Sequence, residues 1–198
     1  MSQSAPIPCD EVVGDDALLV LFANGDRWAA QELTRRLAPR TFAVAVRVLG
    51  DRAEAEDVTQ EAMMRLWKMA PDWQQGQAQV SSWLYRVAMN LCLDRKRRSR
   101  GGTVGLDQVP DPQDPKPGVL EQIQQSARWD ALQAGLMRLP DRQRQAVVLR
   151  HIEELSNPEI AVIMDISVEA VESLTARGKR ALAQALAGQR EALGYGDD

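Results

Sequence analysis

The sequence predicts an all-α protein: two small helical domains joined by a flexible Gly/Pro-rich linker, the second domain containing a helix-turn-helix. Three observations predict this class. Apolar residues recur at steps of three and four over most of the chain, and no segment keeps the period of two that is typical of a half-buried strand. The segment GGTVGLDQVPDPQDPKPG at 101–118 holds four Gly and four Pro without a hydrophobic period. Two short helical segments joined by three residues follow in the second half.

These features divide the 198-residue chain into five parts. We expect a disordered start, a first helical domain, a linker, a second helical domain and a tail, with bounds at 1–14, 15–100, 101–118, 119–190 and 191–198. The chain is 44% hydrophobic and 26% charged, which is ordinary for a globular protein. Its formal net charge is −4, so any strongly basic segment needs a local explanation.

The composition argues against several functional classes. No basic residue precedes Arg27 and no early apolar run is long enough to cross a bilayer, so we expect neither an export signal nor membrane insertion. Cys9, Cys92 and the single His151 do not form a metal-ligand pattern, and we interpret Cys92 as a small buried side chain. No nucleophile arrangement or phosphate-binding glycine loop is found. We therefore expect a cytoplasmic protein without a metal, a cofactor or catalytic activity.

Short breaks divide the first domain into helices. They are expected at 24–26, Pro39, 50–51 and 71–79, where Gly, Pro, Asn and Asp gather. Pro39 is included because proline lacks the amide donor that a helix interior needs.

A helix with one acidic face is predicted to begin after Asp51. Asp51 and Glu54 have the spacing of a capping box, and the segment 51–61 contains five acids against one Arg. The apolar stripe that should face a core consists of Ala55, Val58, Ala62, Leu66 and Met69. The opposite face carries Asp57, Gln60, Glu61 and Met64. A solvated face whose acids favour the helix N-terminus explains this pattern, and a docking surface for a basic partner explains it too.

The next helix ends in a cluster of positive charge. It is predicted to begin near Ser81 or Ser82 and to bury Trp83, Val87, Leu91 and Cys92, while Arg86, Asn90, Asp94 and Arg97 project together elsewhere. Five of the six residues from Arg95 to Arg100 are basic. A cation at a helix C-terminus gains only about 0.3–1 kcal/mol, which does not account for five. The phosphate backbone of a nucleic acid accounts for the cluster better.

The second domain carries a candidate helix-turn-helix. Ser156 and Glu159 form a capping box for a short helix, and Ser167 caps the next helix after the turn DIS at 165–167. Val168, Val171, Leu174, Gly178 and Leu182 lie on one side of that second helix, opposite Glu169, Glu172, Ser173, Ala176, Arg177 and Arg180. A polar and basic outward face is typical of a helix that enters the DNA major groove. An ordinary helical hairpin is the alternative at this level.

The ordered motifs resemble a known family. AEAEDVTQEAMMRLW, WLYRVAMNLCLDRKRR, the Pro-rich connector and LMRLPDRQRQAVVLRHIEELSNPEIAVIMDISVEAVESLTARGKRAL together resemble a bacterial RNA polymerase sigma factor of the extracytoplasmic-function (ECF) group. The resemblance covers nearly all of 15–187 in the family's order and spacing. It implies that the first domain binds core RNA polymerase and melts the minus-ten promoter element, and that the second reads the minus-thirty-five element.

The resemblance also implies a role for particular residues. The polymerase-binding set would be Asp57, Gln60, Glu61 and Met64. The minus-ten set would be Trp73, Arg86, Asn90, Asp94, Arg95, Lys96, Arg97 and Arg98, with Trp73 either an aromatic platform for a base or a packed core residue. The minus-thirty-five set would be Ser167, Glu169, Glu172, Ser173, Arg177, Lys179 and Arg180. Family members are commonly held inactive by an anti-sigma factor, which makes such a protein an expected partner.

Three positions depart from the family pattern. Glu172 stands where a basic residue is usual, Leu174 stands where an Arg is usual, and Met89 stands where an Arg often precedes the Asn. Promoter preference therefore does not transfer from the family. The alternative function is a freestanding helix-turn-helix regulator that binds an operator without polymerase. An acidic docking face and a basic helix within one domain favour the sigma factor.

Overall fold

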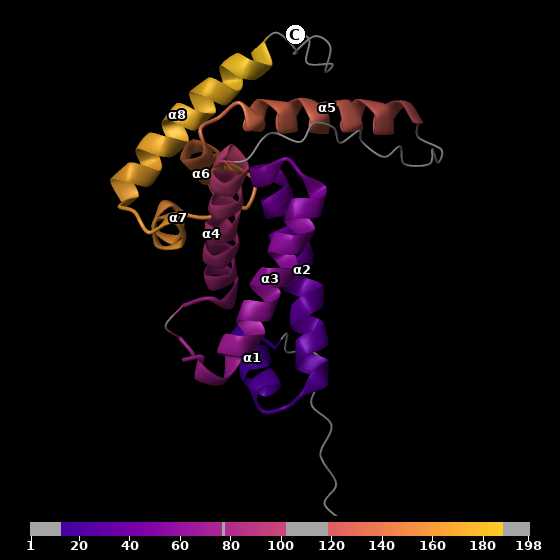
Figure 1. The fold of residues 1–198 in the computed structure, drawn as a ribbon, viewed down its shortest axis with the longest axis vertical. Helices are drawn as coiled ribbons and strands as arrows, with labels where there is room; N and C mark the ends of the chain where they lie inside the picture. Colours follow the sequence, from indigo (N-terminus) through magenta and orange to yellow (C-terminus); the bar gives the residue numbers. More distant parts are fainter. Residues whose placement is uncertain (1–12, 77, 102–118, 188–198) are drawn as a thin grey trace, which may run out of the picture.

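The computed structural model describes residues 13–76, 78–101 and 119–187, and the regular elements in these ranges are all helical (Figure 1). In chain order they are α1 Asp15–Ala23, α2 Arg27–Leu49, α3 Arg52–Met69, the 3-10 turn η1 Ala70–Asp72, α4 Val80–Gly101, α5 Val119–Met137, α6 Asp141–His151, α7 Asn157–Met164 and α8 Val168–Leu186. The predicted fold class is confirmed. The tail, most of the start and residues 102–118 of the predicted linker lie outside the described residues.

Helices α1 to α4 form a bundle around α2, with α3 and α4 packed beside it (Figure 1). The Asp26 side chain caps α2 by accepting hydrogen bonds from the amides of Trp28 and Ala29. The helix ends at Gly50, which takes the left-handed conformation with φ 76° that a helix C-terminus favours. The Asp51 side chain then caps α3 by accepting from the Glu54 amide at 2.9 Å. Local hydrogen bonding thus explains the predicted break at 50–51, where α2 ends and α3 begins.

The prediction of a break at Pro39 was wrong, because α2 runs through this residue without interruption. Pro39 is exposed on the outer side of the helix, where water can reach the carbonyl group that loses its amide donor. On the inner side, buried Leu33, Leu37 and Val44 continue the apolar stripe across the proline. Burial of this stripe outweighs the local cost of the proline.

The predicted start and buried face of α4 also need correction. The helix begins at Val80, so Ser81 and Ser82 lie inside its first turn and neither caps it. Its buried side consists of Leu84, Tyr85, Ala88, Met89, Leu91 and Cys92, whereas Trp83 and Val87 are only half-buried. The buried side of α4 is wide because this helix packs on α2 and α3 and also on α7 of the second half.

The second half begins with α5, which lies across the ends of the first bundle, and ends with the pair α7 and α8 (Figure 1). The capping box at α7 is complete, with the Ser156 amide donating to the Glu159 carboxylate at 2.8 Å. Asp165 closes α7 in the left-handed conformation with φ 54°, and the Ser167 side chain caps α8 by accepting from the Ala170 amide. The predicted three-residue turn between two helices is confirmed.

The two halves share one continuous buried core. α7 packs on α4, and α5 and α6 both pack on α2. The junction is partly polar: buried Arg144 donates to the Val48 carbonyl at 2.7 Å, and buried Gln145 donates to the Met89 carbonyl at 3.1 Å. Nothing in the sequence pattern predicted this packing, and it places the helix-turn-helix beside the basic helix.

Helix α8 approaches α6 closely at Gly178, which is buried. A Cβ atom at this position would lie 2.6 Å from Cγ2 of Val147 and 3.2 Å from the carbonyl oxygen of Gln143. The glycine is therefore required by the short distance between the two helices.

We expect Gly178→Ala to destabilise the protein. Overpacking a core costs about 1–3 kcal/mol, which exceeds the gain of about 1 kcal/mol from replacing a helical glycine. Thermal unfolding followed by circular dichroism should show a lower midpoint for the variant. The matched control places the same change in a Val147→Ala background, where the removed methyl groups leave room. An equal loss in both backgrounds would contradict the proposed clash.

Candidate nucleic-acid interface

The acidic face predicted on α3 is open to solvent. Asp57, Gln60 and Met64 are exposed, with Met64 retaining 51% of its accessible surface, and Glu61 is half-buried. Glu61 accepts a hydrogen bond from Arg65 on the next turn at 2.5 Å. The four residues form one continuous strip along α3, so the predicted polymerase-binding set is brought together in space.

The basic end of α4 lies next to this strip. Arg95 donates to the carboxylate of Glu54 at 2.5 Å and to that of Asp57 at 3.3 Å, and only 24% of its side chain is exposed. The hydrogen bond to Glu54 is the main cause that raises the pKa of Arg95. One member of the predicted DNA set is therefore paired with one member of the predicted polymerase set.

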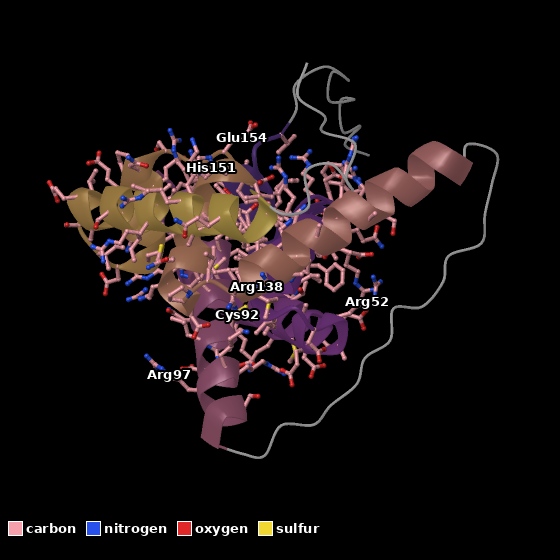
Figure 2. The ribbon with its side chains drawn as sticks, turned by 90° about the horizontal axis from the view of Figure 1, so that it is seen from above. Arg52, Cys92, Arg97, Arg138, His151 and Glu154 are labelled. Atoms are coloured by element: carbon pink, nitrogen blue, oxygen red, sulfur yellow. The ribbon has the colours of Figure 1, made fainter. Side chains whose placement is uncertain are left out.

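Two further basic residues at this end, Arg97 and Arg98, are exposed. Arg97 is 75% exposed, lies 3.6 Å from the carboxylate of Asp94, and points away from the body of the protein (Figure 2). Arg98 is exposed and Lys96 is half-buried. A strip of cationic side chains at the rim of the bundle can follow a phosphate backbone.

The remaining residues of the predicted minus-ten set occupy two environments. Arg86 and Asn90 are exposed one turn apart on α4, and the Arg86 guanidinium lies 4.0 Å from the Asp165 carboxylate of the α7–α8 turn. Trp73 is half-buried against the core, and its buried Nε1 has no protein partner. This supports the packing interpretation of Trp73 over an open stacking platform.

Helix α8 presents the predicted polar face. Ser167, Glu169, Glu172, Arg177, Lys179 and Arg180 are exposed, and Ser173 is half-buried. Ser173 accepts from Arg177 at 2.5 Å, which holds this arginine along the helix. The Glu172 carboxylate accepts a hydrogen bond from the side-chain amide of Asn157 at 3.4 Å, so it points toward α7. Burial is the main cause that lowers the pKa of His151, and the charges of Lys179 and Arg150 lower it further.

Sequence reasoning missed three residues that shape these surfaces. Glu54 was interpreted only as half of a capping box, yet its carboxylate binds Arg95 and leaves the box incomplete. Asp165 was interpreted only as a turn residue, and Asn157 was given no functional role. Each of these pairs is remote in sequence or lies across a turn, so periodicity along a single helix gave no signal.

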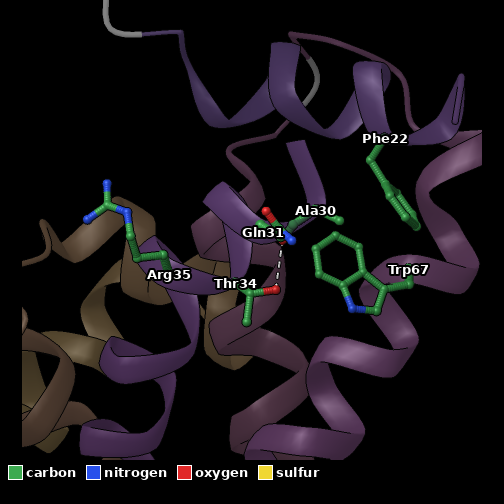
Figure 3. A pocket seen from close by; sticks show the side chains of 6 residues that line it. All are labelled: Phe22, Ala30, Gln31, Thr34, Arg35 and Trp67. Atoms are coloured by element: carbon green, nitrogen blue, oxygen red, sulfur yellow. Dashed lines mark hydrogen bonds between the residues drawn. The ribbon is translucent and has the colours of Figure 1, made fainter. Parts of the chain in front are cut away.

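A shallow apolar depression lies on another face, between α1, α2 and α3 (Figure 3). Its lining is Phe22, Ala30, Gln31, Thr34, Arg35 and Trp67. The rings of Phe22 and Trp67 pack with their centroids 4.6 Å apart.

Within the described ranges no group of His, Cys, Asp and Glu could hold a metal ion. Among the same residues, no helix has the length and apolar character needed to cross a membrane.

A helical protein with a basic helix beside an acidic strip, followed by a helix-turn-helix, defines a DNA-binding transcription factor. The family description Sigma-70 region 2 matches residues 33–101, and Sigma-70, region 4 matches residues 129–182. The chain is 36% identical to the ECF RNA polymerase sigma factor SigE of Mycolicibacterium smegmatis, over 91% of this chain and 70% of that protein. It is 32% identical to SigW of Bacillus subtilis, over 82% and 91%. The chain belongs to the ECF sigma factor family, whose members are transcription initiation factors.

Solved structures agree with this fold. The sigma factor RpoE of Bartonella quintana, solved with the anti-sigma factor NepR, aligns with a TM-score of 0.63 and 19% identity over 79% of this chain and 95% of that one. CnrH, solved with the cytosolic domain of CnrY, aligns with a TM-score of 0.63 and 26% identity over 88% and 97%. Both similarities extend across the two halves of the chain.

We expect Cys92 to be chemically silent in the folded protein. It is fully buried in α4, and this burial raises the pKa of its thiol to about 12, so the reactive thiolate is scarce at neutral pH. In a Cys9→Ser background, a thiol-specific dye should label the native protein slowly and the denatured protein at once. Rapid labelling of the native protein would show that the α4 core opens readily.

Proposed function

We propose that this protein binds core RNA polymerase through α3 and directs it to promoters that α4 and α8 read. The observation that carries this proposal is the exposed strip Asp57, Gln60, Glu61 and Met64, which lies directly beside the basic end of α4. An anionic strip favours a basic partner, whereas the basic end of α4 favours phosphates. Two surfaces of opposite charge on neighbouring helices suit a protein that holds a polymerase and DNA at once.

The minus-ten element is assigned to α4 and the minus-thirty-five element to α8. Arg86, Asn90, Arg97 and Arg98 are exposed on α4, and polar and cationic side chains of this kind hold phosphates and unpaired bases. On α8, Arg177, Lys179 and Arg180 form the cationic part of the outward face. Glu172, which is turned toward Asn157, is suited to accept from a cytosine amino group rather than to meet a phosphate.

The proposed setting is the cytoplasm, where polymerase and DNA are found, and the proposed regulator is an anti-sigma factor. Two related proteins were solved with bound partners, RpoE with the anti-sigma factor NepR and CnrH with the cytosolic domain of CnrY. We propose that a comparable partner covers the α3 strip or α4 of this protein. The freestanding regulator is not favoured, and tight specific binding to intact duplex without polymerase would be its signature.

Reversing the charge of the α3 strip should abolish polymerase binding. We expect Asp57→Arg with Glu61→Arg to reduce co-purification with core polymerase at least tenfold, because two cations replace two carboxylates on the docking face. The matched control is Glu56→Arg, which changes an exposed carboxylate on the same helix but outside the strip. Unchanged co-purification of the double variant, with the same helix content, would contradict the assignment.

Removing the exposed cations of α4 should separate DNA binding from polymerase binding. We expect Arg97→Ala with Arg98→Ala to lower promoter-dependent transcription by tenfold or more at physiological salt, and less at low salt, because phosphate contacts weaken as salt rises. Core binding should be unchanged. The control is Arg52→Ala, which removes an exposed arginine of α3. Equal losses of transcription in both proteins would point to a general charge effect.

A further inference from the structure

The outward face of α8 carries acidic and basic side chains at opposite ends. The exposed carboxylates Glu169 and Glu172 lie in the first half of this helix, and the exposed cations Arg177, Lys179 and Arg180 lie in the second half. In a helix-turn-helix, the N-terminal residues of the second helix contact base edges. Cations bind phosphates instead. The acidic half of α8 therefore stands where bases are read, and the basic half is suited to the DNA backbone.

The two carboxylates have different local environments. Glu169 lies in the first turn of α8, where its own backbone amide and the Ser167 hydroxyl hydrogen-bond its carboxylate and lower its pKa. Glu172 lies one turn further along and accepts a hydrogen bond from Asn157 at 3.4 Å. Glu169 is thus engaged at the helix terminus, which leaves Glu172 as the carboxylate available to read a base.

Asn157 links the two helices of the helix-turn-helix through its side chain. It is the half-buried first residue of α7, and it reaches the exposed Glu172 of α8 across the turn. A free glutamate on a helix surface loses rotamer entropy when it binds a partner. A glutamate that a neighbouring amide already holds in one orientation loses less, so binding costs less. Asn157 is therefore placed to act as a positioning residue for Glu172.

A carboxylate in the major groove discriminates between bases because it only accepts hydrogen bonds. Guanine and thymine present acceptors there, whereas the N4 amino group of cytosine and the N6 amino group of adenine donate. In adenine the N7 acceptor stands beside N6 and repels the second carboxylate oxygen. Cytosine has no acceptor beside its amino group, so a carboxylate favours cytosine over the other three bases.

We propose that Glu172, positioned by Asn157, makes this protein select a cytosine at one position of the minus-thirty-five element. This inference rests on the proposed function, to which it adds a base preference and a positioning residue. It also accounts for an acidic side chain on a face that meets DNA. A carboxylate next to a phosphate weakens binding, whereas one that meets an amino group forms a charge-assisted hydrogen bond.

The test selects binding sites from a library of DNA duplexes randomised over the length of a promoter. The full chain is mixed with core polymerase, and the retained duplexes are sequenced. The wild type should prefer cytosine about tenfold at one position of the upstream element. Glu172→Gln should change this preference to adenine, because a side-chain amide pairs with both N6 and N7 of adenine. All other positions of the element should stay the same.

The positioning role of Asn157 has its own readout. Asn157→Ala should lower the cytosine preference about threefold, given the net value of one hydrogen bond, and leave the other positions unchanged. Asn157→Gln keeps an amide donor and should restore part of the preference. The salt dependence of retention should be the same in all these proteins, because no phosphate contact is removed. A purely structural role would instead weaken the retention of all sequences alike.

The matched control is Glu154→Gln, the same chemical change at an exposed glutamate that lies before α7 and outside the predicted DNA-binding sets. It should select the same element as the wild type. An identical base preference in the wild type and Glu172→Gln, or a change spread over several positions, would overturn the inference and leave the proposed function standing. If the wild type with polymerase retains no two-part element, the proposed function fails and the inference fails with it.

Discussion

The arrangement of the whole chain depends on one buried positive charge. Arg144 lies where the C-terminal ends of α2 and α5 converge, and each end presents carbonyl groups that lack partners within their own helix. A buried guanidinium is costly unless its donors are used, and this one reaches four carbonyl oxygens and lies 3.5 Å from the Asp141 carboxylate. The start of α6, the turn after α5 and the contact with α2 are all fixed by this requirement.

A second constraint links the two candidate interfaces. The carboxylates of Glu54 and Asp57 stand between the α3 strip and the basic end of α4, and Arg95 spans them. Arg95 cannot use all its donors to bind a phosphate while it is paired with both carboxylates. A basic partner bound to Asp57 would compete with Arg95 for this carboxylate. A partner bound at the proposed polymerase-binding strip would therefore alter the charge that the proposed DNA-binding end of α4 offers.

The sequence predicted those features that depend on neighbouring residues. The caps at Asp26, Asp51, Ser156 and Ser167 and the left-handed end at Gly50 are local, and the breaks around them were correctly predicted. Pro39 misled because burial of the inner face of α2 outweighs a local rule. The exposed strips on α3, α4 and α8 also followed from helical periodicity. Arg144 and Gln145 lie in the polar run DRQRQ, which resembles a solvated helix face, so only tertiary packing could reveal that both are buried.

The tight crossing at Gly178 has a consequence for how this protein could acquire new target sites. With no space for a methyl group between α8 and α6, the recognition helix cannot be tilted or shifted by small changes in its supporting residues. The orientation of α8 relative to α6 is effectively constant, and so is the angle at which α6 and α8 together would present it to DNA. Retargeting must then proceed by exchanging outward side chains one at a time, and the unusual Glu172, which is exposed, is an example of variation that a fixed scaffold tolerates.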